Sequence, residues 1–210
     1  ISLKNNASHK TIVDNFCLDY SCLFAKNRPF LFMDEMRDIE KNRINQYLLN
    51  ANKVFNNEFG FYSSSFIPCC NVINSECDYI FANTHIECVQ GSPYYFSFDK
   101  KRQRYIKHAR KWENNVVVHL IRNCLFEPSL NPENIDNVKE CLWQIKKAFK
   151  HKKPAIICTH RLNYIGSIDL QNQLKNLNLL DMLLTEIEKK YPDVVYMSSN
   201  ELARRIKNGN

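Results

Sequence analysis

The sequence predicts a protein of the α/β class, in which strands alternate with helices and the strands form a parallel sheet. In the second half of the chain, short β-branched or apolar runs are each followed by an amphipathic segment, from residue 116 to residue 206. This alternation is typical of βα units. One of the short runs, residues 155–158, is apolar on both faces, which favours a central parallel strand over a half-exposed one.

The first of these units begins with the β-branched residues 116–121, which predict a strand. After a polar loop, Asn131 stands where a helix N-cap is expected, with a proline in the first turn. Apolar residues then recur at spacings of three and four as far as Phe149, so they share one helical face. Pro154 marks the exit from this helix, and residues 155–158 form the next predicted strand.

The remaining units follow the same order. A leucine-rich segment from Leu170 to Ile187 predicts a second helix, which Pro192 ends. Residues 194–197 predict a third strand. Ser198, with a glutamate three residues later, forms a capping box that opens a final helix.

The first half of the chain fits this plan less clearly. Asp34 is placed to cap a long helix that closes near Gly60. A short strand is expected before Pro68, and residues 77–90 alternate roughly, which indicates another. Because no linker, repeat or low-complexity segment interrupts the sequence, we expect a single domain over residues 1–210.

Composition narrows the functional classes. The 210 residues are 44% hydrophobic and 24% charged, as in an ordinary globular protein with one sizeable core. Glycine is scarce, with 4 residues, and neither the dinucleotide fingerprint nor the P-loop pattern occurs. No apolar run approaches the ~20 residues that span a bilayer, so we expect no membrane partner. The net charge of +7 permits an acidic partner without requiring one.

The cysteines predict a reducing compartment. There are 9, an odd number, with irregular spacings and no CxxC pair, which disfavours a disulfide framework and a structural zinc ribbon. We therefore expect reduced packing residues in a cytoplasmic protein. A zinc site formed by Cys77, His85 and Cys88 is a minor alternative, because their spacing matches no compact site.

Polar residues gather where the predicted strands end, and ligands of parallel sheets and barrels bind at these carboxyl ends. His160 can serve there as a general acid or base near neutral pH, and Arg161 can hold a carboxylate or phosphate. The structural alternative is that His160 donates to a backbone carbonyl and Arg161 pairs with a surface acid. The groups at strand ends are residues 63–65, then Arg122 with Asn123 and Glu127, then Thr159 to Arg161 with Asn163 and Tyr164, and finally residues 198–200.

A basic stretch, residues 100–112, lies outside these groups. It carries seven Lys or Arg residues, with Tyr105 and Trp112 interleaved. Such a mixture can bind nucleic acid through phosphate contacts and stacking. The alternative that we favour is a solvated loop or helix, and nucleic acid is not the partner we expect.

Three motifs carry a resemblance to a known family. RNCLFEPSL, KKPAIICTHRLNYIGSID and YPDVVYMSSNEL occur in this order, and the chain resembles the C-terminal part of polysaccharide deacetylase-like proteins, the NodB-homology group. The likeness is closest to a bacterial subgroup with a KPAIISSHRVNYIG-like stretch, a WPDVEF-like strand and an RNxxFEPS-like segment. It runs from about Phe55 to Ile206 and covers most of the chain.

The resemblance implies a distorted (β/α) barrel of the glycoside hydrolase and deacetylase type, which could lack its first strand here. It implies a metal-dependent hydrolase that removes acetyl groups from a polysaccharide or sugar precursor, with zinc or a similar divalent ion. The metal polarises the acetyl carbonyl and activates water, a carboxylate takes a proton, and an imidazolium protonates the leaving group. His160 occupies the place of the general acid and His9 that of a metal ligand. The substrate groove would be lined by Ser65, Arg122, Asn123, Glu127, Arg161 and Asn163.

The chain departs from the family pattern around the metal. Asn5 stands where the HxxxH motif has its first histidine, and only His9 remains. The two-aspartate motif would precede Ile1, and Ser65 and Ile67 stand where the family has an arginine. Two alternatives therefore stay open: a carbohydrate-binding member of the same fold without catalysis, and a nucleic-acid-binding module that uses the basic stretch.

Overall fold

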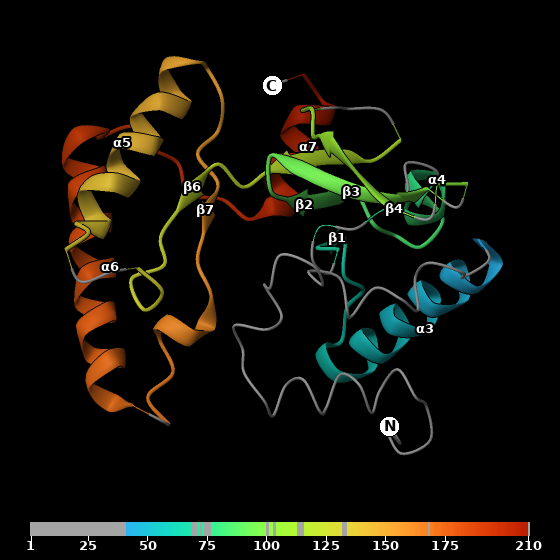
Figure 1. Cartoon of the computed structure of the whole chain (residues 1–210), viewed down its shortest axis with the longest axis horizontal. Coiled ribbons are helices and arrows are strands. Elements are labelled where there is room, and N and C mark those ends of the chain that lie inside the picture. The colour runs from blue at the N-terminus through green and yellow to red at the C-terminus, as the bar shows by residue number, and fades with distance from the viewer. Residues whose placement is uncertain are drawn as a thin grey trace. The chain divides into compact units, whose positions relative to one another are not determined.

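The computed structural model describes residues 41–209 apart from 69, 70, 72, 74–76, 100, 103, 113–115, 132, 133 and 168. The chain divides into two compact units, residues 1–119 and 120–210. The described residues form five α-helices and several short strands, which confirms the mixed α/β class (Figure 1). Within this part of the chain, the strands form three small sheets. The predicted cap at Asp34 lies outside the described residues.

The first unit contains a long helix, a short parallel strand pair and a hairpin. Strands β1 and β2 run parallel, with Ser65 opposite Cys88, and β5 joins the same sheet beside β2. This confirms the short strand expected before Pro68. The elements are α3 (Lys41–Phe59), β1 (Ser65–Phe66), α4 (Cys77–Ala82), β2 (Cys88–Gly91), β3 (Tyr94–Asp99) and β4 (Arg104–Ala109), and β5 (Val118–Ile121) crosses the boundary between the units.

Buried polar groups fasten α3 to the rest of the first unit. Asn52, which is 6% exposed, donates to the backbone oxygens of Ser63 at 3.1 Å and Thr84 at 2.7 Å. Its side-chain oxygen accepts from the Ser63 N–H at 2.9 Å. The helix ends before Gly60, as expected, and Gly60 takes the positive φ of 78° that a helix C-terminus favours.

Residues 104–109 of the basic stretch form a strand, where a loop or helix was expected. They pair antiparallel with β3. Exposure alternates along them: Ile106 and His108 are half-buried, whereas Lys107 and Ala109 are exposed. This is the two-residue period of a strand with one covered face. His108 stacks on Tyr95 and bonds Ser97, so the covered face is held by cross-strand contacts.

The second unit contains a βαβ arrangement, but its first strand is not the predicted one: β6 lies in the segment expected to be a polar loop, and the strand expected at 116–121 is β5 of another sheet. Strands β6 and β7 pair in parallel, with Cys124 opposite Ile157, and α5 connects them. The strand expected at 155–158 is thereby confirmed in part. The elements are β6 (Cys124–Leu125), α5 (Asn137–Lys150), β7 (Ile157–Cys158), the 3-10 helix η4 (Arg161–Asn163), α6 (Leu170–Lys190) and α7 (Ser199–Lys207).

The core of the second unit lies between α5, α6 and the strand pair. Helices α5 and α6 lie side by side in Figure 1. Removing one such large apolar side chain from water stabilises the fold by about 1.5–3 kcal/mol. The core consists of Cys124, Phe126, Val138, Cys141, Leu142, Ile145, Leu183 and Ile187.

Two local predictions in the second unit are wrong. Helix α5 begins after Asp136, whose side chain accepts from the Lys139 N–H, rather than after Asn131. Asn131 instead bonds the Asn137 side chain. Residues 194–197 form no strand in the described structure, because a turn links Val194 to Tyr191 and the next two side chains are exposed. The capping box at Ser198 is confirmed.

Candidate functional site

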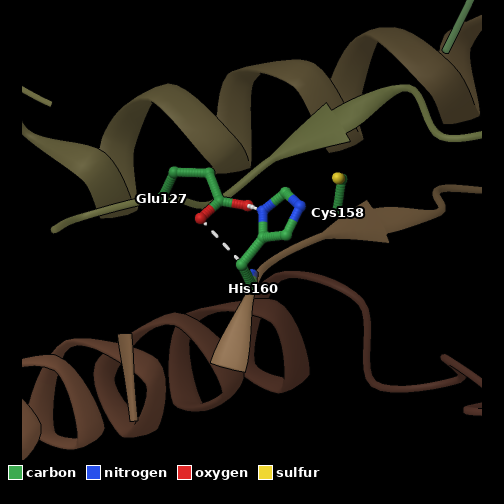
Figure 2. A group of neighbouring side chains, drawn as sticks. All are labelled: Glu127, Cys158 and His160. Atoms are coloured by element: carbon green, nitrogen blue, oxygen red, sulfur yellow. Dashed lines mark hydrogen bonds and ion pairs between the residues drawn. The ribbon is translucent and has the colours of Figure 1, made fainter. Parts of the chain in front are cut away.

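The site forms where the parallel strands β6 and β7 end. Leu125 of β6 lies opposite Cys158 of β7. Glu127 and His160 each follow two residues later, so the strand pairing brings them together although 33 residues separate them in sequence. Figure 2 shows these two side chains pointing toward one another, with Cys158 beside them.

Glu127 is a buried carboxylate, 3% exposed, with donors on both oxygens. One oxygen accepts from Nδ1 of His160 at 2.5 Å. The other accepts from the His160 backbone N–H at 3.3 Å and from the Asn163 side-chain amide at 2.8 Å. A buried charge needs such partners, because its desolvation is costly without them. The carboxylate is therefore held in one orientation.

Glu127 also sets the tautomer of His160. A carboxylate oxygen accepts hydrogen bonds, so Nδ1 carries the ring hydrogen and Nε2 of the neutral ring carries the lone pair. The His160 side chain is 61% exposed despite this anchor. Nε2 can therefore meet a reactant and exchange a proton with it.

Asn163 connects the parts of the site from the interior. Its side chain is fully buried. The amide also donates to the His160 backbone oxygen at 2.9 Å, and its oxygen accepts from the Ser129 N–H at 2.9 Å. Asn176 of α6 donates to the backbone oxygen of Asn163 at 3.0 Å. This placement favours a positioning role for Asn163 over a direct contact with substrate.

Cys158 adds a thiol to the site. One donor atom from each of Glu127, Cys158 and His160 lies within 4.8 Å of the others, so this group could hold a metal ion. Burial raises the pKa of the Cys158 thiol, Arg122 opposes that shift, and Glu127 adds to it. The thiol is therefore mostly protonated at neutral pH, and a metal would have to displace that proton.

Thr159 and Tyr164 form a polar contact beside this group. The Thr159 hydroxyl and the Tyr164 hydroxyl lie 2.8 Å apart. Burial raises the pKa of Tyr164, and the hydrogen bond to Thr159 opposes that shift. Both residues belong to the polar group that the sequence predicts after β7.

The other predicted groove residues of the second unit take different places. The Asn123 amide donates to the Pro154 oxygen at 2.9 Å, and its oxygen accepts from the Ile156 N–H at 2.8 Å. Asn123 thereby fastens the segment that leads into β7. Arg122 is half-buried, and within the described residues its Nε has no hydrogen-bond partner. Arg161 is exposed at the start of η4.

None of the remaining candidates is a described residue of the second unit. Ser65 belongs to the first unit, on β1. His9 lies outside the described residues. Of the minor zinc alternative, Cys77 and Cys88 are buried and His85 is exposed. Within the part of the chain that the structure describes, these three do not form a metal-binding group.

The first unit contains a second histidine with two polar partners. Nε2 of His119 lies 2.8 Å from an Asp78 oxygen, and its Nδ1 lies 3.0 Å from a nitrogen of Arg110. Because a guanidinium can only donate, Nδ1 accepts and Nε2 carries the hydrogen. His119 is thus held as the opposite tautomer to His160.

Sequence reasoning placed Glu127 and His160 in one site but missed that they bond each other, and it treated Cys158 as a packing residue. The sequence carried no direct signal for the pair, because β6 lies in the segment expected to be a loop. Only the pairing of β6 with β7 shows that both residues stand two positions beyond their strands.

No family model, no curated protein and no solved structure matches this chain. Among the described helices, none has the length and apolar character needed to cross a membrane.

Proposed function

We propose that this chain is a carbohydrate deacetylase of the polysaccharide deacetylase type, built on a distorted (β/α) barrel, with His160 as general acid. One observation carries the proposal: a buried carboxylate, Glu127, holds Nδ1 of an imidazole whose side chain stays 61% exposed. Hydrolases use a carboxylate-oriented imidazole to move protons. The position at the carboxyl end of a parallel strand pair agrees with where ligands bind in α/β folds.

Hydrolysis of an acetyl group must deliver a proton to the departing amine or hydroxyl. His160, protonated at Nε2, would supply it. Glu127 would hold the ring in position, and its negative charge would stabilise the positive charge of the protonated ring. Arg161, exposed beside the histidine, would bind polar groups of the sugar.

The divalent ion that the resemblance implies would polarise the acetyl carbonyl. Its predicted ligand, His9, lies outside the described residues. The group of Glu127, Cys158 and His160 does not fit this catalytic role. The Glu127 oxygens already accept from three donors, and an ion on Nε2 would occupy the atom that transfers the proton.

The proposal is tested by acetate release from acetylated chitooligosaccharides and acetylated xylan, with the purified chain supplied with zinc. We expect His160→Ala to lower the rate by about 100-fold or more, the usual contribution of a general acid. His151→Ala is the matched control, because His151 is also exposed but lies at the end of α5. Equal rates for wild type and His160→Ala would overturn the assignment. Sugar binding without acetate release would leave a carbohydrate-binding protein.

A second candidate function rests on the β3–β4 hairpin. Lys107 of β4 is exposed, and its Nζ lies 4.1 Å from the centre of the Tyr94 ring. Lys101 and Arg102 are also exposed, at the hairpin turn. Cations beside aromatic rings are typical of single-stranded nucleic-acid surfaces. This function predicts an affinity for single-stranded DNA that falls steeply with salt and is lost in Lys101→Glu/Lys107→Glu.

A further inference from the structure

We propose that Cys158 and His160 form a binding site for a soft metal ion such as Zn²⁺, separate from the catalytic ion, and that filling it stops proton transfer by His160. The binding site rests on the described side chains alone. The loss of proton transfer rests, in addition, on the proposed function.

The imidazole is already prepared as a metal ligand. Glu127 accepts from Nδ1, which leaves the lone pair of the neutral ring on Nε2. Metal-ligating histidines commonly donate their other ring hydrogen to a carboxylate in this way, and that bond fixes the ring and makes it a better ligand. Glu127 is itself held by Asn163, so the ring is supported from the buried side.

The thiol supplies the second ligand. Figure 2 shows Cys158 on the side of the imidazole that faces away from Glu127. The donor atoms of the group lie within 4.8 Å of one another. Zinc bound by sulfur at about 2.3 Å and by nitrogen at about 2.0 Å requires the two ligands to approach to about 4.3 Å or less. Rotation about the Cα–Cβ bond of Cys158 is the movement that would bring the sulfur to this distance.

The environment leaves room for the remaining ligands and selects the type of ion. The His160 side chain is 61% exposed, so water or substrate oxygen can complete the coordination. Thiolate with imidazole favours zinc, cadmium and copper(I), whereas magnesium and calcium prefer oxygen.

Occupation of the site and catalysis exclude each other. The ion binds the lone pair of Nε2, and a general acid must carry its proton on that same atom. Excess zinc is therefore expected to inhibit acetate release, and removal of the thiol is expected to weaken that inhibition.

Binding is tested by titrating the full-length chain with Cd²⁺ and following the ultraviolet absorption of cadmium–thiolate bonds. Cd²⁺ held by oxygen or nitrogen ligands alone does not contribute to this signal. Because other cysteines can add to it, the measure is the difference between wild type and Cys158→Ser. Cys141→Ser is the matched control, since Cys141 is fully buried in the core and does not belong to the group of Glu127, Cys158 and His160.

We expect Cys158→Ser to lose one equivalent of bound cadmium and Cys141→Ser to lose none. His160→Ala is expected to weaken the binding of the same equivalent of cadmium. Glu127→Gln is expected to lower the affinity for that equivalent by about ten-fold, the usual lower bound for a partner of a ligating histidine. Identical titrations for wild type and Cys158→Ser would overturn the site.

The functional consequence is measured separately, as the ratio of acetate release at high and low zinc in each variant. A ratio that rises toward one in Cys158→Ser supports the inhibitory role, and an unchanged ratio overturns it. If the wild type releases no acetate at all, the proposed function and the inhibitory role both fail. The cadmium titration still decides the metal site in that case.

Discussion

Glu127 and His160 are joined by a hydrogen bond of 2.5 Å between a carboxylate oxygen and Nδ1, although they lie 33 positions apart in the sequence. The bond holds the imidazole through Nδ1 and leaves Nε2 free of this partner. Its consequences can be tested without knowing the substrate.

His160 and His119 are expected to be opposite tautomers. Glu127 requires a hydrogen on Nδ1 of His160, whereas Arg110 requires a lone pair on Nδ1 of His119. Nitrogen-15 NMR of the neutral rings should therefore show the Nδ1–H form at His160 and the Nε2–H form at His119. Glu127→Ala should remove the preference at His160 and leave His119 unchanged. Finding the Nε2–H form at His160 in the wild type would contradict the geometry.

Loss of the Asn163 side chain should destabilise the protein. The Asn163→Ala change deprives Glu127 and the Ser129 N–H of buried partners. Such unsatisfied groups cost about 1–3 kcal/mol each, so urea unfolding should show a lower free energy of unfolding by at least that amount. Asn178→Ala is the matched control. Asn178 is exposed on α6, and surface changes usually stay within about 0.5 kcal/mol. Equal losses for both variants would contradict this role.

The core cysteines should react slowly and should make stability depend on alkaline pH. Burial raises the pKa of Cys124 to about 11 and, with smaller contributions from Cys124 and Glu140, that of Cys141 to about 12. Alkylation requires the thiolate, so mass spectrometry at pH 8 should find both cysteines unmodified in the folded protein and modified in urea. Above the ordinary pKa of 9.0, the unfolded chain loses these protons and the folded chain keeps them. Stability should therefore fall as the pH rises from 9 toward about 11. A urea midpoint that stays constant over this range would contradict the prediction.

The start of α5 can be located by substitution. Asp136 accepts from the Lys139 N–H at 2.9 Å. Asp136→Ala should lower the free energy of unfolding by about 1 kcal/mol, the usual effect of losing an N-cap. Asp193→Ala is a suitable control, because Asp193 is an exposed aspartate in a turn. If both variants unfold at the same urea concentration, Asp136 is not the functional cap.

The sequence allowed the mixed α/β class and the helices α5, α6 and α7 to be predicted, because helical periodicity and capping residues are local signals. The cap of α5 was misplaced because Asn131 and Asp136 are both good capping residues. Residues 194–197 have strand-like side chains, but Val195 and Tyr196 remain exposed. A strand needs a neighbouring strand as well as suitable residues, and only the tertiary structure supplies it.

Glu127, His160 and Asn163 were named from the sequence because they follow predicted strands, but the hydrogen bonds that join them were not predicted. Their mutual bonds depend on which strands pair and in which register. Cys158 was not predicted as a site residue, because a cysteine in an apolar run is usually a packing residue.

The two contacts of Asn123 with Pro154 and Ile156 have a consequence for how this region tolerates change in chain length. A slip of one position between β6 and β7 would turn the imidazole to the opposite surface of the sheet, because neighbouring residues in a strand point to opposite faces. The Asn123 side chain bonds two backbone groups just before β7, the Pro154 oxygen and the Ile156 N–H. Insertions and deletions should consequently be accepted on the α5 side of Pro154. They should be rejected between Pro154 and His160, because the number of residues there determines which face of the sheet carries the imidazole.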